Sequence, residues 1–158
     1  MDFNPKSLAE MTPRQIARYW PNLAANYHKT SEQTIDYNCV AWIVNQTDNP
    51  IDFSVDEEGD PLPDADLTSA PYKAYFESIG FTECENGDLE EGFQKIAIYE
   101  FPDGQFAHVA KQLENGHWSS KIGELEDIEH YSLNALEYEN YNGECYGVVK
   151  FFMKRPPA

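Results

Sequence analysis

The chain has 158 residues, of which 41% are hydrophobic and 14% aromatic, and this length and composition fit one globular domain over 1–158. Asp and Glu number 28 against 11 Lys and Arg, which gives a formal net charge of −17 at pH 7. That charge argues against binding to the phosphates of nucleic acids and to anionic membranes. It is typical of a solvated surface, and it also suits a basic protein partner.

The sequence contains neither a secretion signal nor a short metal motif. It begins Met-Asp-Phe-Asn-Pro-Lys, which lacks the basic and apolar regions of a signal peptide, and no run reaches transmembrane length. We therefore expect a cytoplasmic protein whose three cysteines, Cys39, Cys84 and Cys145, are reduced. Their spacing matches no CxxC pattern, so we expect neither a bound metal nor a cofactor.

The first half of the chain predicts short helices separated by long loops. Residues 12–20 combine an N-cap threonine with a proline at the first helical position. Residues 22–36 are polar and aperiodic, which predicts a loop. The next helix, 39–44, is apolar nearly all round and should therefore be buried. Residues 47–67 are rich in proline and acidic side chains, and they predict a second long loop.

The second half predicts one amphipathic helix followed by antiparallel strands. Residues 69–79 carry apolar side chains at helical spacing before Gly80. Strands are predicted over 81–85, 94–101, 106–113, 117–122 and 146–153, with a further short helix near 133–138. The expected class is α+β, in which N-terminal helices, including a buried cysteine-bearing helix, pack on an antiparallel β-meander.

Cys39 and His108 are the candidate catalytic pair. Cys39 opens the predicted apolar helix, and the unpaired N–H groups of a helix N-terminus lower the pKa of a thiol. His108 lies within the second long strand of the meander. A helix packed against that sheet face would bring the imidazole to the thiol as its general base.

This order of elements resembles the papain-like cysteine hydrolases, in particular the NlpC/P60 and CHAP group. The resemblance implies that Cys39 occupies the nucleophile position and His108 the position of the base. More closely, four segments look like a bacterial domain family of unknown function: Tyr37-Asn38-Cys39-Val40-Ala41-Trp42, His108-Val109-Ala110-Lys111-Gln112, Gly116-His117-Trp118-Ser119-Ser120-Lys121-Ile122-Gly123 and Asp127-Ile128-Glu129-His130.

A third residue should orient the imidazole, and the sequence leaves its identity open. A two-residue turn at Asn115-Gly116 would place Ser119 and Lys121 on the same sheet face as His108. Lysine cannot accept a hydrogen bond from the ring. A bulge in either strand would instead bring Ser120 to that face, and we take Ser120 as the third catalytic candidate.

Other residues are candidates for lining a substrate site. Tyr37 and Asn38 precede the cysteine directly, although asparagine there is also a good helix N-cap. Trp42 and Lys121 are the remaining candidates, and Trp42 can equally be a core residue. Asp127, just beyond the predicted hairpin, is an alternative to Ser120 as the orienting residue.

Three functions follow from these observations. The first is a cysteine hydrolase, amidase or acyl transferase that acts on a peptide, isopeptide or glutamine amide of a peptide or protein substrate. The second is a non-catalytic immunity or inhibitor protein that binds a basic protein through the acidic loop around 56–66. The third and weaker alternative is a nucleic-acid mimic. Apart from these functions, a zinc site built from Cys39, His108 and an acid is a minor alternative reading of the same side chains.

Overall fold

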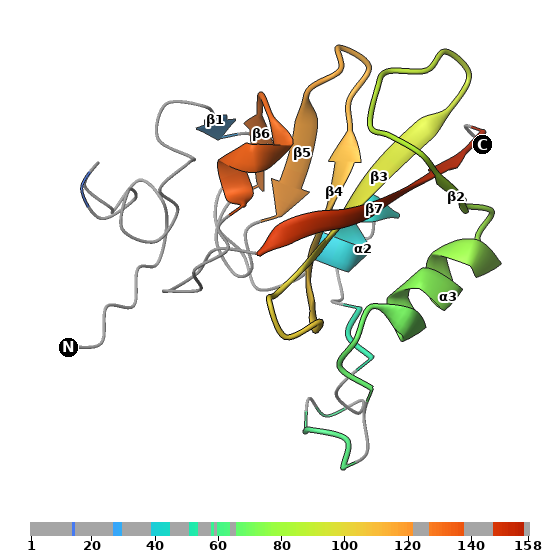
Figure 1. Cartoon of the computed structure of the whole chain (residues 1–158), viewed down its shortest axis with the longest axis vertical. Coiled ribbons are helices and arrows are strands. Elements are labelled where there is room, and N and C mark those ends of the chain that lie inside the picture. Colours follow the sequence, from blue (N-terminus) through green and yellow to red (C-terminus); the bar gives the residue numbers. More distant parts are fainter. Residues whose placement is uncertain are drawn as a thin grey trace.

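A computed structural model describes residues 14, 27–29, 39–44, 51–53, 58, 60–63, 66–121, 127–137 and 147–156 (Figure 1). At residues 27–29, 127, 134 and 135 it describes the backbone alone. The dominant element is a seven-stranded antiparallel sheet with the strand order β1-β6-β5-β4-β3-β7-β2. The four strands β3 to β6 form a meander, and β7 and β1 extend it on either side.

The strands are β1 (Tyr27–Lys29), β2 (Thr82–Cys84), β3 (Gln94–Glu100), β4 (Phe106–Gln112), β5 (Trp118–Lys121), β6 (Asp127–His130) and β7 (Val148–Arg155). Two α-helices, α2 (Cys39–Ile43) and α3 (Ala70–Ser78), and one 3-10 helix, η2 (Leu133–Leu136), accompany them. The predicted helix over 69–79 and all five predicted strands are confirmed to within two residues at each end. Their strong periodicity and their turn residues explain this agreement.

The predicted fold class is wrong. The described chain is mostly one antiparallel sheet with few short helices, whereas a papain-like fold needs a helical N-terminal region packed on a meander. Of the helix expected over 12–20, only Arg14 lies within the described residues, where it is helical. The cysteine-bearing helix α2 has only five residues, so it covers a small part of the sheet and cannot define the architecture.

Two strands, β1 and β6, were not predicted. Residues 27–29 lie in the segment expected to be a loop, and residues 127–130 lie just beyond the predicted hairpin, where no strand was expected. Neither segment has the alternation of apolar and polar side chains that marks a half-buried strand. Both form because a neighbour pairs with them: β6 pairs with β5 over its whole length, and β1 pairs in turn with β6.

The β4–β5 hairpin has a three-residue loop instead of the predicted two-residue turn. The Leu113 N–H donates to the His117 carbonyl at 2.7 Å, and Gly116 takes a positive φ of 87° inside the loop. Lys111 therefore pairs with Ser119, which differs by one position from the predicted register. Because a shift of one residue exchanges the two faces of a strand, Ser120 takes the face that the predicted register gave to Ser119.

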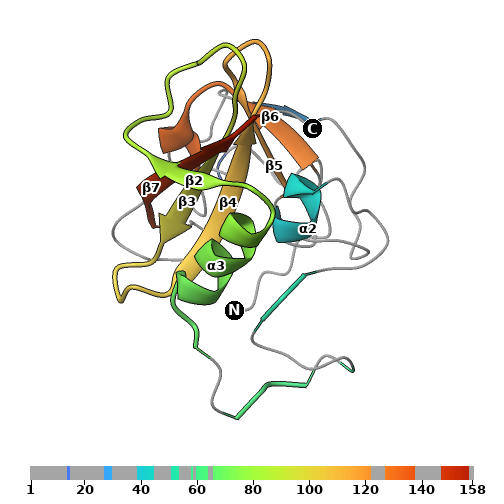
Figure 2. The same ribbon diagram turned by 90° about the vertical axis from the view of Figure 1, so that its right-hand side faces the viewer.

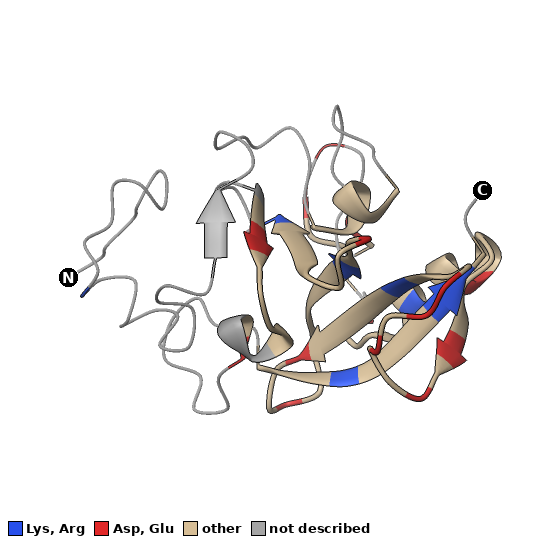
Figure 3. Ribbon diagram, turned by 90° about the horizontal axis from the view of Figure 1, so that it is seen from above, with Lys and Arg blue, Asp and Glu red and all other residues tan. Residues whose placement is uncertain are grey.

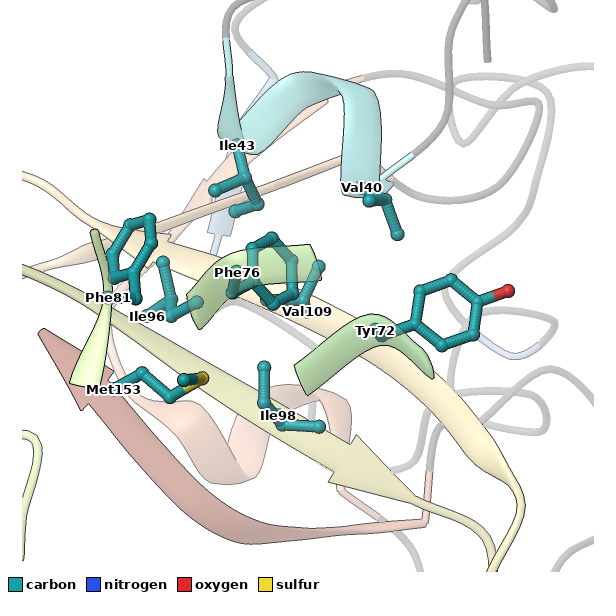
Figure 4. Packing of buried hydrophobic residues seen from close by; sticks show 9 residues of the cluster. All are labelled: Val40, Ile43, Tyr72, Phe76, Phe81, Ile96, Ile98, Val109 and Met153. Atoms are coloured by element: carbon teal, nitrogen blue, oxygen red, sulfur yellow. The ribbon is translucent and has the colours of Figure 1, made fainter. Parts of the chain in front are cut away.

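The two faces of the sheet carry different elements. Helices α2 and α3 cover one face, and η2 lies on the other (Figures 1 and 2). A buried apolar cluster fills the space under the two helices (Figure 4) and consists of Val40, Ile43, Tyr72, Phe76, Phe81, Ile96, Ile98, Val109 and Met153. Since neighbouring residues of a strand point to opposite faces, Val109 under α2 places His108 on the face of η2.

Candidate functional site

A chain of buried polar side chains crosses three neighbouring strands on the face of η2. Nε2 of His108, on β4, lies 2.9 Å from Oγ of Ser120, on β5. The same Oγ lies 2.7 Å from Nε2 of His130, on β6. Nδ1 of His130 lies 2.9 Å from the Ser132 carbonyl oxygen. The three side chains are 1%, 0% and 0% exposed, so this arrangement, which we call the His-Ser-His chain, is closed to solvent.

The Ser132 carbonyl oxygen at the end of the chain fixes the direction of each hydrogen bond in it. A carbonyl oxygen can only accept, so Nδ1 of His130 carries a proton and, in the neutral ring, Nε2 is the acceptor. The Ser120 hydroxyl must then donate to His130 and accept from Nε2–H of His108. The Ser120 hydroxyl and both nitrogens of His130 thereby have partners with both imidazoles neutral, which is the arrangement that a buried site favours.

The pKa values of both histidines support this neutral state. Burial lowers the pKa of His108 well below its ordinary value, and the neighbouring His130 lowers it further. Burial also lowers the pKa of His130 to about 4, against smaller opposing effects of its bond to Ser132 and of Glu129. Tyr99 packs beside His108 with ring centroids 5.4 Å apart and donates to the Leu133 carbonyl, which closes the site from the side of η2.

The structure places Cys39 away from this chain. Cys39 begins α2 and packs against the apolar cluster on the opposite face of the sheet. The two candidate catalytic residues are therefore separated by the sheet, while Ser120 does contact His108. A general base must come within hydrogen-bond reach of the proton that it removes, and the imidazole of His108 faces away from the thiol.

The thiol of Cys39 is also shifted in the direction opposite to the one predicted. Burial raises its pKa to about 11, although backbone N–H groups of Val109 and Val40 act to lower it. The negative charge of Asp52 raises it slightly more. At neutral pH the side chain is therefore a protonated thiol, which is a poor nucleophile. A helix of only five residues offsets little of the cost of burying a thiolate.

Cys39 instead forms part of the wall of a cavity of about 260 Å³. Its other walls come from the segment that precedes α3, from α3 itself and from the start of β4, and they include Asp52, Leu67, Tyr72, Gln105 and Phe106. The Tyr72 ring stacks on Phe106 with centroids 3.9 Å apart, and its hydroxyl donates to Asp52 at 3.3 Å. We call this the Tyr72 cavity.

The remaining candidates have other surroundings. The indole N–H of Trp42 donates to Ser119 at 2.9 Å, and the Lys111 ammonium lies 3.9 Å from the centre of the Trp42 ring. Ser119 thus lies on the face of α2 and not beside His108. Lys121 is fully buried on β5. Tyr37, Asn38 and the side chain of Asp127 lie outside the described residues.

Sequence reasoning missed three residues that matter here. His130 was given no role in the site, and only its place on β6 brings it to Ser120. Asp52 and Tyr72 were assigned to a loop and to the apolar face of a helix, and the cavity between them is formed by tertiary contacts. The proline-rich loop that contains Asp52 was the one available signal, since long loops often carry function.

Neither a cluster of metal-ligating side chains nor a membrane-spanning helix occurs among the described residues. Among those residues, no three His, Cys, Asp or Glu side chains lie close enough together to hold a metal ion. In the same part of the chain, no helix has the length and hydrophobicity that are needed to cross a bilayer.

These features define a class of β-sheet domain in which a polar His-Ser-His chain occupies one face and a small cavity the other. A family model described as a domain of unknown function, DUF7689, matches residues 28–154. Because the match covers most of the chain, the protein belongs to this family. Comparisons with curated proteins and with solved structures find no match. The predicted resemblance to a domain of unknown function is thus confirmed, and its bacterial origin stays a prediction.

Replacement of Ser120 by alanine tests whether the His-Ser-His chain stabilises the fold. The variant leaves the facing nitrogens of two buried histidines without their partner, so the free energy of unfolding should fall by about 1–3 kcal/mol. Urea denaturation measures it. Ser78→Ala is the matched control, because Ser78 is exposed on α3 and its loss should cost less than about 0.5 kcal/mol. Equal effects of the two substitutions would contradict this role.

The stability of the protein should fall on acidification. The unfolded chain binds protons at the histidines near pH 6.5, whereas the native chain does so only near pH 4 at His130 and well below 6.5 at His108. The free energy of unfolding is therefore undiminished by these histidines above about pH 6.5, and it falls as the pH is lowered toward about 4. Urea denaturation at a series of pH values checks this. The variant His130→Gln should show a shallower dependence, and an unchanged slope would contradict the assignment.

Proposed function

We propose that this protein is a non-catalytic binding protein for a basic protein partner. One observation carries the proposal: the histidine that a Cys39 hydrolase needs as its base is buried on the opposite sheet face, where it bonds to Ser120. Because burial raises its pKa to about 11, the Cys39 thiol is protonated at neutral pH, and a protonated thiol is a poor nucleophile. The fold is then better suited to present a surface than to carry out covalent chemistry.

The distribution of charge supports a basic partner. Lys and Arg lie chiefly along the strands, whereas Asp and Glu also occupy the loops around the sheet (Figure 3). Several basic side chains are engaged there: Lys95 and Lys154 both pair with Glu90, and Arg155 donates to the Ile79 carbonyl. The exposed acidic residues of the described chain are Asp52, Glu58, Asp60, Asp66, Glu77, Glu83, Glu85, Asp88, Glu91, Asp103 and Glu114.

Part of this acidic surface surrounds the Tyr72 cavity. Asp52 lines it, and Asp66 and Asp103 lie close in sequence to the lining residues Leu67 and Gln105. The two loops that carry Asp66 and Asp103 are joined, because Thr68 and Gln105 form a β-bridge. Both carboxylates also accept backbone hydrogen bonds within their loops, so their positions are defined. Acidic surfaces of this kind speed association with basic partners and select against acidic ones.

Binding to a basic peptide tests the proposal. A fluorescent nonapeptide of alternating arginine and serine should bind to the protein, and its affinity should fall about tenfold or more between roughly 50 mM and 300 mM salt, because salt screens exposed charges. Fluorescence anisotropy measures both values. Failure of the wild type to bind, or binding that is independent of salt, would overturn the proposal.

Alkylation separates this proposal from the predicted cysteine hydrolase. At pH 7, Cys39 should react with iodoacetamide more slowly than the thiol of an unstructured cysteine peptide, since burial keeps it protonated. Mass spectrometry of the digested protein gives the rate at each cysteine, and Cys84 serves as an internal reference. Faster reaction at Cys39 than in the peptide, extending to pH 6, would revive the hydrolase prediction and contradict the binding proposal.

A further inference from the structure

The Tyr72 cavity is a site of defined chemistry. Its volume of about 260 Å³ lies below the roughly 300–1,000 Å³ typical of pockets for drug-sized ligands. It therefore suits one extended side chain better than a cofactor or a sugar. Val40, Ile51, Leu67 and Phe106 contribute apolar side chains to its wall, beside the polar groups of Asp52, Tyr72 and Gln105. This mixed lining favours an occupant with an aliphatic stem and a polar end.

The wall of the cavity contains one charged side chain. Among the described residues that line it, Asp52 alone carries a charged side chain, and it accepts a hydrogen bond from the Tyr72 hydroxyl at 3.3 Å. In Figure 4 this hydroxyl points away from the other labelled side chains of the cluster. An ionised carboxylate can accept several hydrogen bonds at once. Cys39, as a neutral thiol, adds no second charge. The cavity thus combines apolar side chains with polar groups and one negative charge.

The aromatic side chains of the wall are held in place. Tyr72 is 7% exposed and stacks on Phe106 with an interplanar angle of 12°. Phe53 packs edge-on against Tyr72, with ring centroids 5.0 Å apart. Rings fixed in this way offer a surface on which a flat cationic group can stack without first being ordered.

We propose that the Tyr72 cavity binds one arginine side chain of the basic partner, with its guanidinium hydrogen-bonded to Asp52 and its plane against the aromatic wall. This inference rests on the proposed function and names its central contact. Arginine suits the site better than lysine for two reasons: its guanidinium is more weakly hydrated, and it stacks on aromatic rings while donating to a carboxylate. The acidic residues near the cavity attract the basic partner at long range, and the cavity itself gives the preference for arginine over lysine.

Two nonapeptides of equal charge separate the cavity from the general acidic surface. One alternates arginine with serine and the other alternates lysine with serine. Fluorescence anisotropy gives their affinities for the wild type and for three variants. Asp52→Asn removes the charge at the cavity, and Leu67→Trp fills it from an exposed position. Asp88→Asn is the matched control, because Asp88 is exposed in the loop before β3 and its substitution changes the net charge equally.

The wild type and Asp88→Asn should bind the arginine peptide several-fold more tightly than the lysine peptide. Asp52→Asn and Leu67→Trp should lose this preference and bind the arginine peptide about tenfold more weakly, which is the effect of one charge-assisted hydrogen bond. Nuclear magnetic resonance should show that the amide signals of Gln105 and Ala107, both in the cavity wall, shift with the arginine peptide.

Three results would overturn the inference, and they differ in what they leave standing. If both peptides bind equally and Asp52→Asn weakens binding no more than Asp88→Asn does, the cavity is not the site, but binding of a basic partner stands. A preference for the lysine peptide would reject arginine as the occupant. If neither peptide binds to the wild type, the proposed function fails together with the cavity.

Discussion

The pairing register between β4 and β5 is the constraint on which the His-Ser-His chain and the contact of α2 with the sheet depend. The three-residue loop at 114–116 pairs Lys111 with Ser119. In a sheet with alternating side chains, this one pairing assigns every residue of the two strands to a face. His108 and Ser120 consequently lie together under η2, and Ser119 reaches Trp42 on the other side. A register displaced by one position would dismantle the His-Ser-His chain and the Trp42 contact together.

The two faces of the sheet bury different kinds of side chain. The face under η2 buries histidines, which is costly unless each nitrogen finds a partner. The chain from His108 to Ser132 satisfies its internal nitrogens with neutral rings and uses three adjacent strands to do so. The face under α2 and α3 is mostly apolar, and a cavity lies where Asp52 and Tyr72 meet the start of β4. The buried histidines and this cavity are thereby placed on opposite sides of the sheet.

The same division gives Cys39 surroundings that favour the neutral thiol, although this cysteine begins a helix. A reactive thiolate needs a positive or strongly polar environment. Cys39 has an apolar cluster behind it and a carboxylate near its cavity. Both favour the neutral thiol. The surroundings that keep Cys39 uncharged leave Asp52 as the charged group of the cavity, and this combination favours a cationic occupant.

The amino-acid sequence by itself determined the elements with strong local patterns: α3 with its apolar spacing and terminal glycine, and five strands bounded by turn residues. It also determined the acidity of the surface and singled out Cys39, His108 and Ser120. Only the tertiary structure decided that β6 joins the sheet, that Ser120 and His130 meet, and that Cys39 faces away from His108. Local patterns record the preferences of single segments. The pairing register of two strands, and the sheet face that each side chain takes, change when the loop between the strands gains or loses one residue. The cavity at Asp52 and Tyr72 arises between segments far apart in the chain, and no local pattern encodes it.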